Sequence, residues 1–140
     1  MLTRLIPALL LLIACGGEYK GDSGSTTDDP GTTTPTFTEV RDDVLLPSCG
    51  FATCHGAGGE AGDLLLDEAT SYANMVDVES SAAPGEILVI PGDADNSYLV
   101  KKLVGDPSIV DDAMPPPSGG LSPESITMIQ EWIDAGAADD

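Results

Sequence analysis

The chain is poor in basic side chains. It has five Lys and Arg residues against 24 Asp and Glu residues among its 140 positions, and its formal net charge is −19. A nucleic-acid partner is excluded, because binding to phosphates needs a basic stripe that this sequence lacks. The acidity either keeps the domain soluble or attracts a basic partner, and composition alone favours the first interpretation.

The sequence also lacks an apolar run long enough to span a bilayer. Its one long apolar segment, Leu5–Ile13, follows a short positive start and is too short for a permanent membrane helix, so residues 1–14 predict an export signal. The run Leu12-Ile13-Ala14-Cys15-Gly16 resembles a bacterial lipobox, which implies cleavage before Cys15 and a diacylglycerol on its thiol. Such a lipid anchors a protein to a membrane without spanning it. The alternative is a secreted protein with an unpaired Cys15.

Residues 16–35 are almost all Gly, Ser, Thr, Pro and Asp and cannot bury a core. We therefore expect residues 15–35 to form a lipidated end and a flexible tether, followed by one folded domain over residues 36–140. The expected location is that of an exported bacterial lipoprotein facing the periplasm or the cell surface. By resemblance to other lipoproteins, Gly16 after Cys15 favours the outer membrane.

Helical patterns dominate the folded part and predict an all-α domain with about four short helices. Thr36-Phe37-Thr38-Glu39 has the spacing of a capping box and predicts a helix that ends at Leu46, before Pro47. A weaker pattern predicts a second helix from Asp67 to about Val76.

Two further helices are predicted towards the C-terminal end. One covers Ser97–Val104, with Asp95 or Asn96 as its cap and Gly105 after its end. The last and clearest has Ser122 as its cap, Pro123 at its first position and Gly136 at its end. Its apolar stripe consists of Ile126, Ile129, Trp132 and Ile133.

Beyond Cys15 only two cysteines remain, and the single histidine directly follows the second, in the run Ser48-Cys-Gly-Phe-Ala-Thr-Cys-His-Gly56. Two thiols that can add to haem vinyl groups, with an imidazole for the iron, are the arrangement that holds a c-type haem. The usual spacer has two residues and this one has four, so the extra residues must bulge outward. One alternative is a disulfide between Cys49 and Cys54 with His55 on the surface. A zinc site is less favoured, because no fourth ligand is evident.

A haem held by one histidine needs a second axial ligand or leaves its sixth position open. The candidate methionines are Met75, Met114 and Met128. Met75 and Met128 lie in predicted helices, where packing in the core is the simpler role. Met114 lies in a proline-rich loop, which presents a thioether at a defined place, and we favour it as the ligand.

Four segments in this order resemble class I cytochromes c, especially the small planctomycete-type cytochrome c domains. They are Cys49 to Gly56, Pro91-Gly92-Asp93 with Asn96 to Leu99, Met114-Pro115-Pro116, and Leu121 to Ala137. The resemblance implies an α-helical fold around one haem c. It implies covalent attachment through Cys49 and Cys54, His55 as the proximal iron ligand and Met114 as the distal ligand.

The function expected from this pattern is electron transfer to and from a redox protein partner, without enzymatic activity. Ligation by His and Met leaves no open position on the iron, and no catalytic constellation is evident elsewhere. Two alternatives stay open. The first is a haem-free lipoprotein of the same fold, with a Cys49–Cys54 disulfide and a structural or binding role. The second keeps the haem with a loosely held Met114 and senses ligands or acts like a peroxidase.

Overall fold

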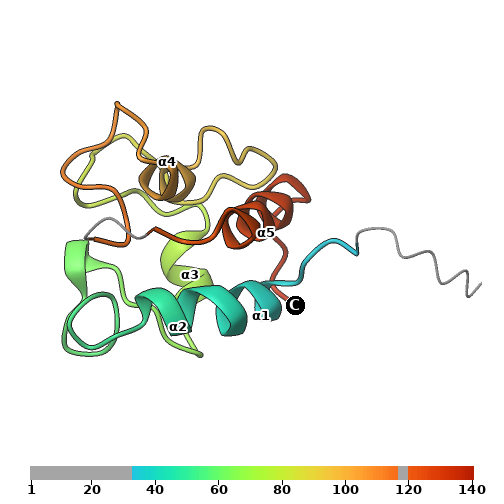
Figure 1. Cartoon of the computed structure of the whole chain (residues 1–140), viewed down its shortest axis with the longest axis horizontal. Helices are drawn as coiled ribbons and strands as arrows, with labels where there is room; N and C mark the ends of the chain where they lie inside the picture. Colours follow the sequence, from blue (N-terminus) through green and yellow to red (C-terminus); the bar gives the residue numbers. More distant parts are fainter. Residues whose placement is uncertain (1–32, 117–119) are drawn as a thin grey trace, which may run out of the picture. The chain divides into compact units, whose positions relative to one another are not determined.

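The computed structural model describes residues 33–116 and 120–140 (Figure 1). The predicted signal, the predicted lipidation site Cys15 and all but the last residues of the predicted tether lie outside the described residues. Four helices and only isolated β-bridges occur in the described part, in agreement with the predicted all-α class. None of these helices combines the length and the apolar character that crossing a membrane requires.

The first helix is continuous from Phe37 to Cys49 and has three segments: α1 (Phe37–Glu39), the π-helical η1 (Val40–Leu45) and α2 (Leu46–Cys49). It begins with the predicted capping box, because the Thr36 hydroxyl accepts from the Glu39 N–H at 3.1 Å and the Glu39 carboxylate accepts from the Thr36 N–H at 2.9 Å.

The predicted end of this helix at Leu46 is wrong, since the helix continues through Pro47 to Cys49. In the π-helical segment the Leu46 N–H donates to the Arg41 carbonyl, five residues earlier. This wider turn moves the preceding carbonyls away from the places where they would meet the Pro47 ring. Pro47 is the second residue of α2, and its missing N–H leaves one preceding carbonyl of the continuous helix without that helical bond. The helix therefore carries Cys49 on its last turn.

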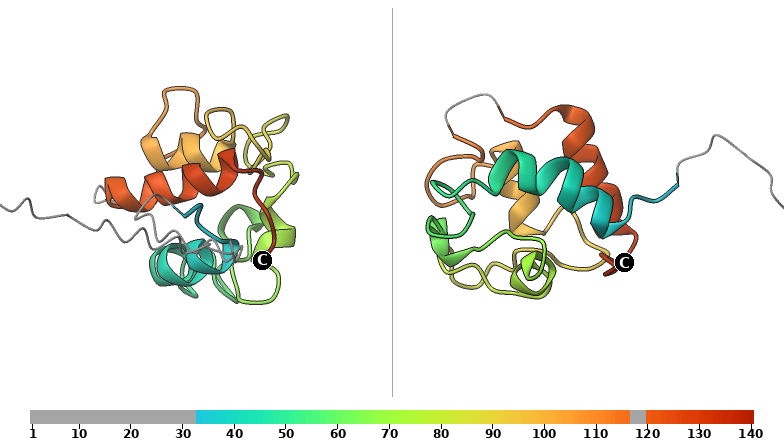
Figure 2. Two further views of the ribbon diagram at one scale, coloured as in Figure 1. Left: turned by 90° about the vertical axis from the view of Figure 1, so that its right-hand side faces the viewer. Right: turned by 90° about the horizontal axis from the view of Figure 1, so that it is seen from below.

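The other regular elements are η2 (Ala61–Asp63), a short 3₁₀ turn, and three α-helices. These are α3 (Ser71–Met75), α4 (Tyr98–Val104) and α5 (Pro123–Asp134). Helix α5 packs against both α4 and the first helix, as both views of Figure 2 show. It has the predicted cap, because the Ser122 hydroxyl accepts from the Ser125 N–H at 3.1 Å.

Helices α3 and α4 begin later than predicted. The Asp67 carboxylate accepts from the N–H groups of Ala69 and Thr70, which forms a turn and delays α3 to Ser71. In α4 the N-cap is Ser97, so the prediction of Asp95 or Asn96 as the cap is wrong. The Ser97 hydroxyl instead accepts from the Ile90 N–H and donates to the Asp93 carbonyl, both at 2.8 Å. Gly105 ends α4 in the left-handed conformation, as predicted.

A cluster of three aromatic rings joins the first helix, α3 and α5. The Phe37 ring lies 5.2 Å from the Tyr72 ring and 5.3 Å from the Trp132 ring, measured between centroids. The Trp132 indole N–H donates to the Ala138 carbonyl at 2.9 Å, and the Tyr72 hydroxyl donates to the Ala137 carbonyl at 2.8 Å. These bonds fold the segment after α5 back over the start of the first helix.

We predict that Ile129→Ala lowers the free energy of unfolding by about 2–5 kcal/mol, because Ile129 is completely buried and its truncation leaves a cavity. Denaturant titration of the purified protein measures this. Thr127→Ala, at an exposed position of the same helix, is the control and should change the free energy by less than about 0.5 kcal/mol. Equal effects of the two substitutions would contradict this packing of α5.

Candidate functional site

The four residues between Cys49 and Cys54 form a compact turn that returns the chain to the end of α2. The Phe51 carbonyl accepts from the N–H groups of Cys54 and Gly56, both at 2.8 Å. The Cys49 carbonyl accepts from the N–H of His55 at 3.1 Å. Phe51 is 56 % exposed, so the spacer lies on the outside of the turn.

Two glycines pack directly against this spacer. A Cβ atom on Gly56 would lie 2.2 Å from the Gly50 carbonyl oxygen, and one on Gly59 would lie 2.4 Å from the Ala52 carbonyl oxygen. No side chain fits at either position without moving the backbone. The longer spacer is therefore accommodated by a close approach of two backbone segments, which keeps both cysteines beside His55.

His55 is oriented by a backbone carbonyl. Its Nδ1 atom lies 3.3 Å from the Leu64 carbonyl oxygen. A carbonyl oxygen can only accept, so this hydrogen bond requires the proton on Nδ1 and leaves the lone pair of Nε2 free for a metal. Carbonyl partners of this kind set the tautomer and ring orientation of metal-binding histidines. The His55 carbonyl in turn accepts from the Leu66 N–H at 2.6 Å, which ties the two segments together.

Cys49, Cys54, His55 and Met114 all line one cavity of about 270 Å³, although Met114 is far from the others in the sequence. Phe51, Pro115 and Pro116 add apolar surface to its walls. A second cavity of about 290 Å³ shares His55, Ala61 and Met114 with the first. Taken together, the adjoining cavities reach the size range of cofactor pockets. In Figure 1 the green loop after α2 and the orange loop before residue 117 lie at the same end of the domain.

The structure distinguishes the three candidate methionines. Met75 is completely buried in the core, and Met128 packs against the core on α5. Neither lines the two cavities that contain His55, whereas Met114 lines both.

Helix α4 holds the loop that carries Met114, mainly through Lys102. The Lys102 carbonyl accepts from the Met114 N–H at 2.9 Å. The Lys102 ammonium donates to the Val110 carbonyl at 2.8 Å and to the Asp112 carbonyl at 2.6 Å. Sequence reasoning missed this role, because only the position of α4 beside the loop reveals it. It also missed Leu64, which acts through its backbone and has no signature in the sequence.

Both thiols are free in the structure. Burial, and to a smaller extent the neighbouring Cys54, raises the pKa of the Cys49 thiol to about 11. Cys49 is therefore a protonated thiol at neutral pH in the polypeptide, and its metal-binding and nucleophilic thiolate form is suppressed.

This donor set suits a covalently attached haem. It offers two thiols, an imidazole nitrogen with a free lone pair and a thioether sulfur, all at one apolar cavity. Within residues 33–116 and 120–140, no group of three or more His, Cys, Asp or Glu side chains is placed to hold a metal ion. Trp132 lies in the core and lines neither of the cavities that contain His55.

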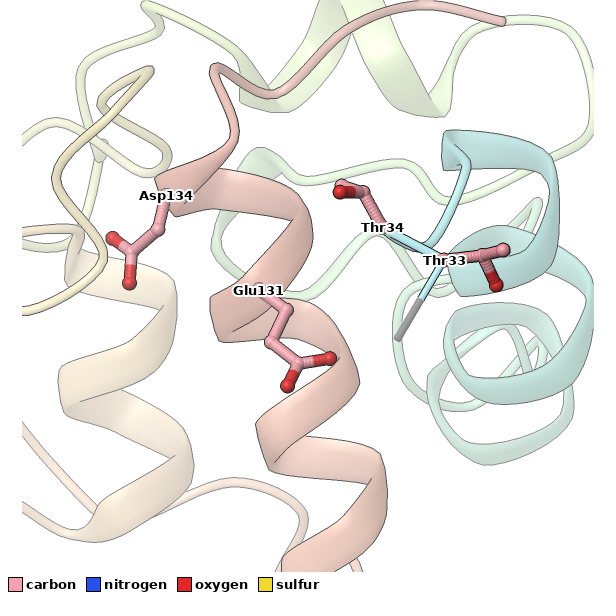
Figure 3. A pocket seen from close by; sticks show the side chains of 4 residues that line it. All are labelled: Thr33, Thr34, Glu131 and Asp134. Carbon is pink, nitrogen blue, oxygen red and sulfur yellow. The ribbon is translucent and has the colours of Figure 1, made fainter. Parts of the chain in front are cut away.

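A separate hollow lies between α5 and the segment before the first helix (Figure 3). Thr33, Thr34, Glu131 and Asp134 line it. In Figure 3 the two hydroxyl side chains and the two carboxylates do not converge on one point. The Asp134 carboxylate is already bonded to the Ala94 N–H at 2.9 Å, so its role is structural.

Comparisons with protein-family models, with curated proteins and with solved structures found no match to this chain.

We predict that Cys49 in the haem-free, folded polypeptide reacts with iodoacetamide roughly a hundredfold more slowly at pH 8 than an ordinary cysteine. The pH dependence of the rate should give an apparent pKa near 11. A variant with Cys15→Ser and Cys54→Ala leaves Cys49 as the only thiol. Its pKa should stay raised, because burial is the larger cause. An apparent pKa near 8.5 would show that Cys49 is exposed to water.

Proposed function

We propose that this protein is an electron-transfer c-type cytochrome with one haem, attached to a bacterial membrane by a lipid on Cys15. The observation that supports this most is that Cys49, Cys54, His55 and Met114 line one cavity. Cys49 and Cys54 hold the haem as thioethers. His55 Nε2 and Met114 Sδ bind its iron.

Joining the two thiols to a haem would need no reactant besides the thiols and the vinyl groups. Each thiol would add its sulfur to one carbon of a vinyl group and its hydrogen to the other, so attachment would need no external oxidant. The raised pKa of Cys49 keeps that hydrogen on the sulfur at neutral pH. The bound haem supplies a one-electron couple between ferric and ferrous iron.

The two axial side chains favour electron transfer over catalysis at the iron. The Leu64 carbonyl orients His55, and Lys102 holds the Met114 loop by three hydrogen bonds, so hydrogen bonds to the backbone position both proposed ligands. A firmly held methionine leaves no position for a substrate. Met ligation also raises the reduction potential. These features support a carrier over a sensor or peroxidase with a loose distal ligand.

The surface charge supports a basic redox partner. Among the described basic residues, Arg41 pairs with Asp42 and Lys101 pairs with Glu86, both at 2.6 Å. The Lys102 ammonium bonds to backbone carbonyls. These cations are used within the fold, and the large excess of carboxylates creates a negative field that steers a basic partner towards the domain.

We predict that the matured protein shows the weak near-infrared absorption band of methionine-ligated ferric haem, and that Met114→Ala abolishes this band. The loss follows because the thioether sulfur is removed while His55 and the thioether links remain. Met128→Leu and Met75→Leu are the controls, since neither methionine lines the cavities with His55. If the band disappears in a control and survives in Met114→Ala, the ligand assignment is wrong.

We predict that Cys15→Ser moves the protein from the membrane fraction to the soluble fraction of the producing bacterium, because the substitution removes the thiol that takes the lipid. Fractionation followed by immunoblotting measures this. The haem content per molecule should stay the same, since Cys15 is distant in sequence from the haem-binding residues. Retention in the membrane fraction would contradict the proposed anchor.

A further inference from the structure

The Met114 loop, residues 106–116, places no residue fully in the core. Every residue from Val104 to Pro116 is at least partly exposed to solvent, and Val110 is 43 % exposed. Met114 itself is half-buried and packs against the core. Packing alone therefore does not fix this loop, so its hydrogen bonds decide where the Met114 thioether lies.

The hydrogen bonds that hold the second half of the loop all lead to two residues of α4. Within residues 33–116 and 120–140, residues 110–116 bond to the rest of the chain only through Tyr98 and Lys102. The Tyr98 phenolic oxygen accepts from the Val110 N–H at 2.9 Å. Lys102 makes the other three bonds, one through its backbone carbonyl and two through its ammonium. The Lys102 side chain is therefore the main polar anchor of this half of the loop.

The Lys102 ammonium holds a bend in the backbone. It joins the Val110 and Asp112 carbonyls, which lie on either side of Asp111. Asp111 has a φ angle of 58°, in the left-handed region that residues other than glycine adopt at a cost. Such a bend persists where the contacts around it outweigh that cost, and a hydrogen bond from a charged donor is the stronger kind.

The neighbouring Lys101 has no such role. Its ammonium pairs with the Glu86 carboxylate at 2.6 Å, and no hydrogen bond joins its side chain to the described residues of the Met114 loop. Two lysines of the same helix therefore differ in one respect, which is contact with the loop. This makes Lys101 a matched control for Lys102.

Resting on the proposed function, in which Met114 binds the iron, we propose that the Lys102 ammonium is a positioning residue for Met114. By joining the carbonyls of Val110 and Asp112, it keeps the loop closed and the distal position of the iron inaccessible to external ligands. An external ligand binds with its intrinsic affinity multiplied by the fraction of molecules in which the loop is open. Removal of the ammonium raises that fraction, so a small neutral ligand such as imidazole binds more tightly.

The first test is an imidazole titration of the ferric, haem-loaded protein, followed through the Soret band. In Lys102→Leu we expect the apparent Kd to fall by roughly tenfold, the effect of losing about one hydrogen bond to a charged group. Lys101→Leu removes the same charge from the adjacent position and should leave the Kd unchanged. Lys102→Arg keeps the charge and the donors, and its Kd should stay close to the wild-type value.

A double-mutant cycle shows whether Lys102 acts through Met114. In the Met114→Ala background imidazole meets no competing thioether, so Lys102→Leu should have no further effect on the Kd. The same fall in both backgrounds would mean that Lys102, which also lines the second cavity, acts there directly. That result would overturn the positioning role.

Amide hydrogen exchange of the full chain reports on the loop itself and does not depend on haem. In Lys102→Leu we expect the N–H groups of Val110 and Met114 to exchange roughly tenfold faster, because the loop opens more often. Tyr98→Phe removes the other side-chain contact and should act in the same direction. Lys101→Leu should leave both rates unchanged.

The outcomes separate this inference from the proposed function. If the protein carries haem, and Lys102→Leu changes neither the imidazole Kd nor the exchange rates, the positioning role is refuted while the cytochrome proposal stands. A wild-type protein without haem refutes the cytochrome proposal. Unchanged exchange rates in Lys102→Leu would then refute the contact between Lys102 and the loop as well.

Discussion

The close approach of Gly56 and Gly59 to the spacer between the cysteines is the constraint on which the rest of the site depends. Each glycine lies so near a carbonyl of that spacer that a side chain at its position would not fit. This contact folds a longer spacer than usual into a compact turn and keeps Cys49 and Cys54 next to His55. Without it, two thiols separated by four residues would have no defined position relative to the imidazole.

From this turn outward, each functional group is held by a different part of the chain. The first helix delivers Cys49, because a π-helical segment lets it continue through Pro47. The carbonyl of Leu64 selects the tautomer of His55. Helix α4 holds the Met114 loop and also provides Tyr98 and Lys102 to the second cavity. One helix therefore holds the loop of the proposed iron ligand Met114 and also lines the second cavity.

Much of the fold could be predicted from local signals. The capping box at Thr36, the cap at Ser122 and the stop at Gly105 depend on a few adjacent residues, and all three occur as predicted. Two wrong predictions concern helix ends that depend on competing hydrogen bonds or on the geometry of a neighbouring turn. The helix end at Pro47 depends on the turn before it, and the start of α3 depends on side-chain bonds of Asp67 that compete with helical ones.

In the candidate site, too, some residues could be predicted from the sequence and others only from the fold. Cys49, Cys54 and His55 are recognisable because they lie within one short run, and Met114 because three prolines follow it directly. The roles of the Leu64 carbonyl and of Lys102 carry no sequence signal, since they arise only from where the backbone brings these groups. Tertiary contacts of this kind lie outside what periodicity and motif spacing can predict.

The central claim, that the polypeptide encloses one haem bound through two thioethers, is tested most directly by producing the full chain with cytochrome c maturation machinery. The purified protein is then denatured, and its mass and visible spectrum are recorded. We predict a Soret band and a mass increase of one haem that both survive denaturation, and that replacement of Cys49 and Cys54 by Ala abolishes them. A colourless wild-type protein would contradict the account, and a mass reduced by two hydrogens would identify the disulfide-bonded alternative.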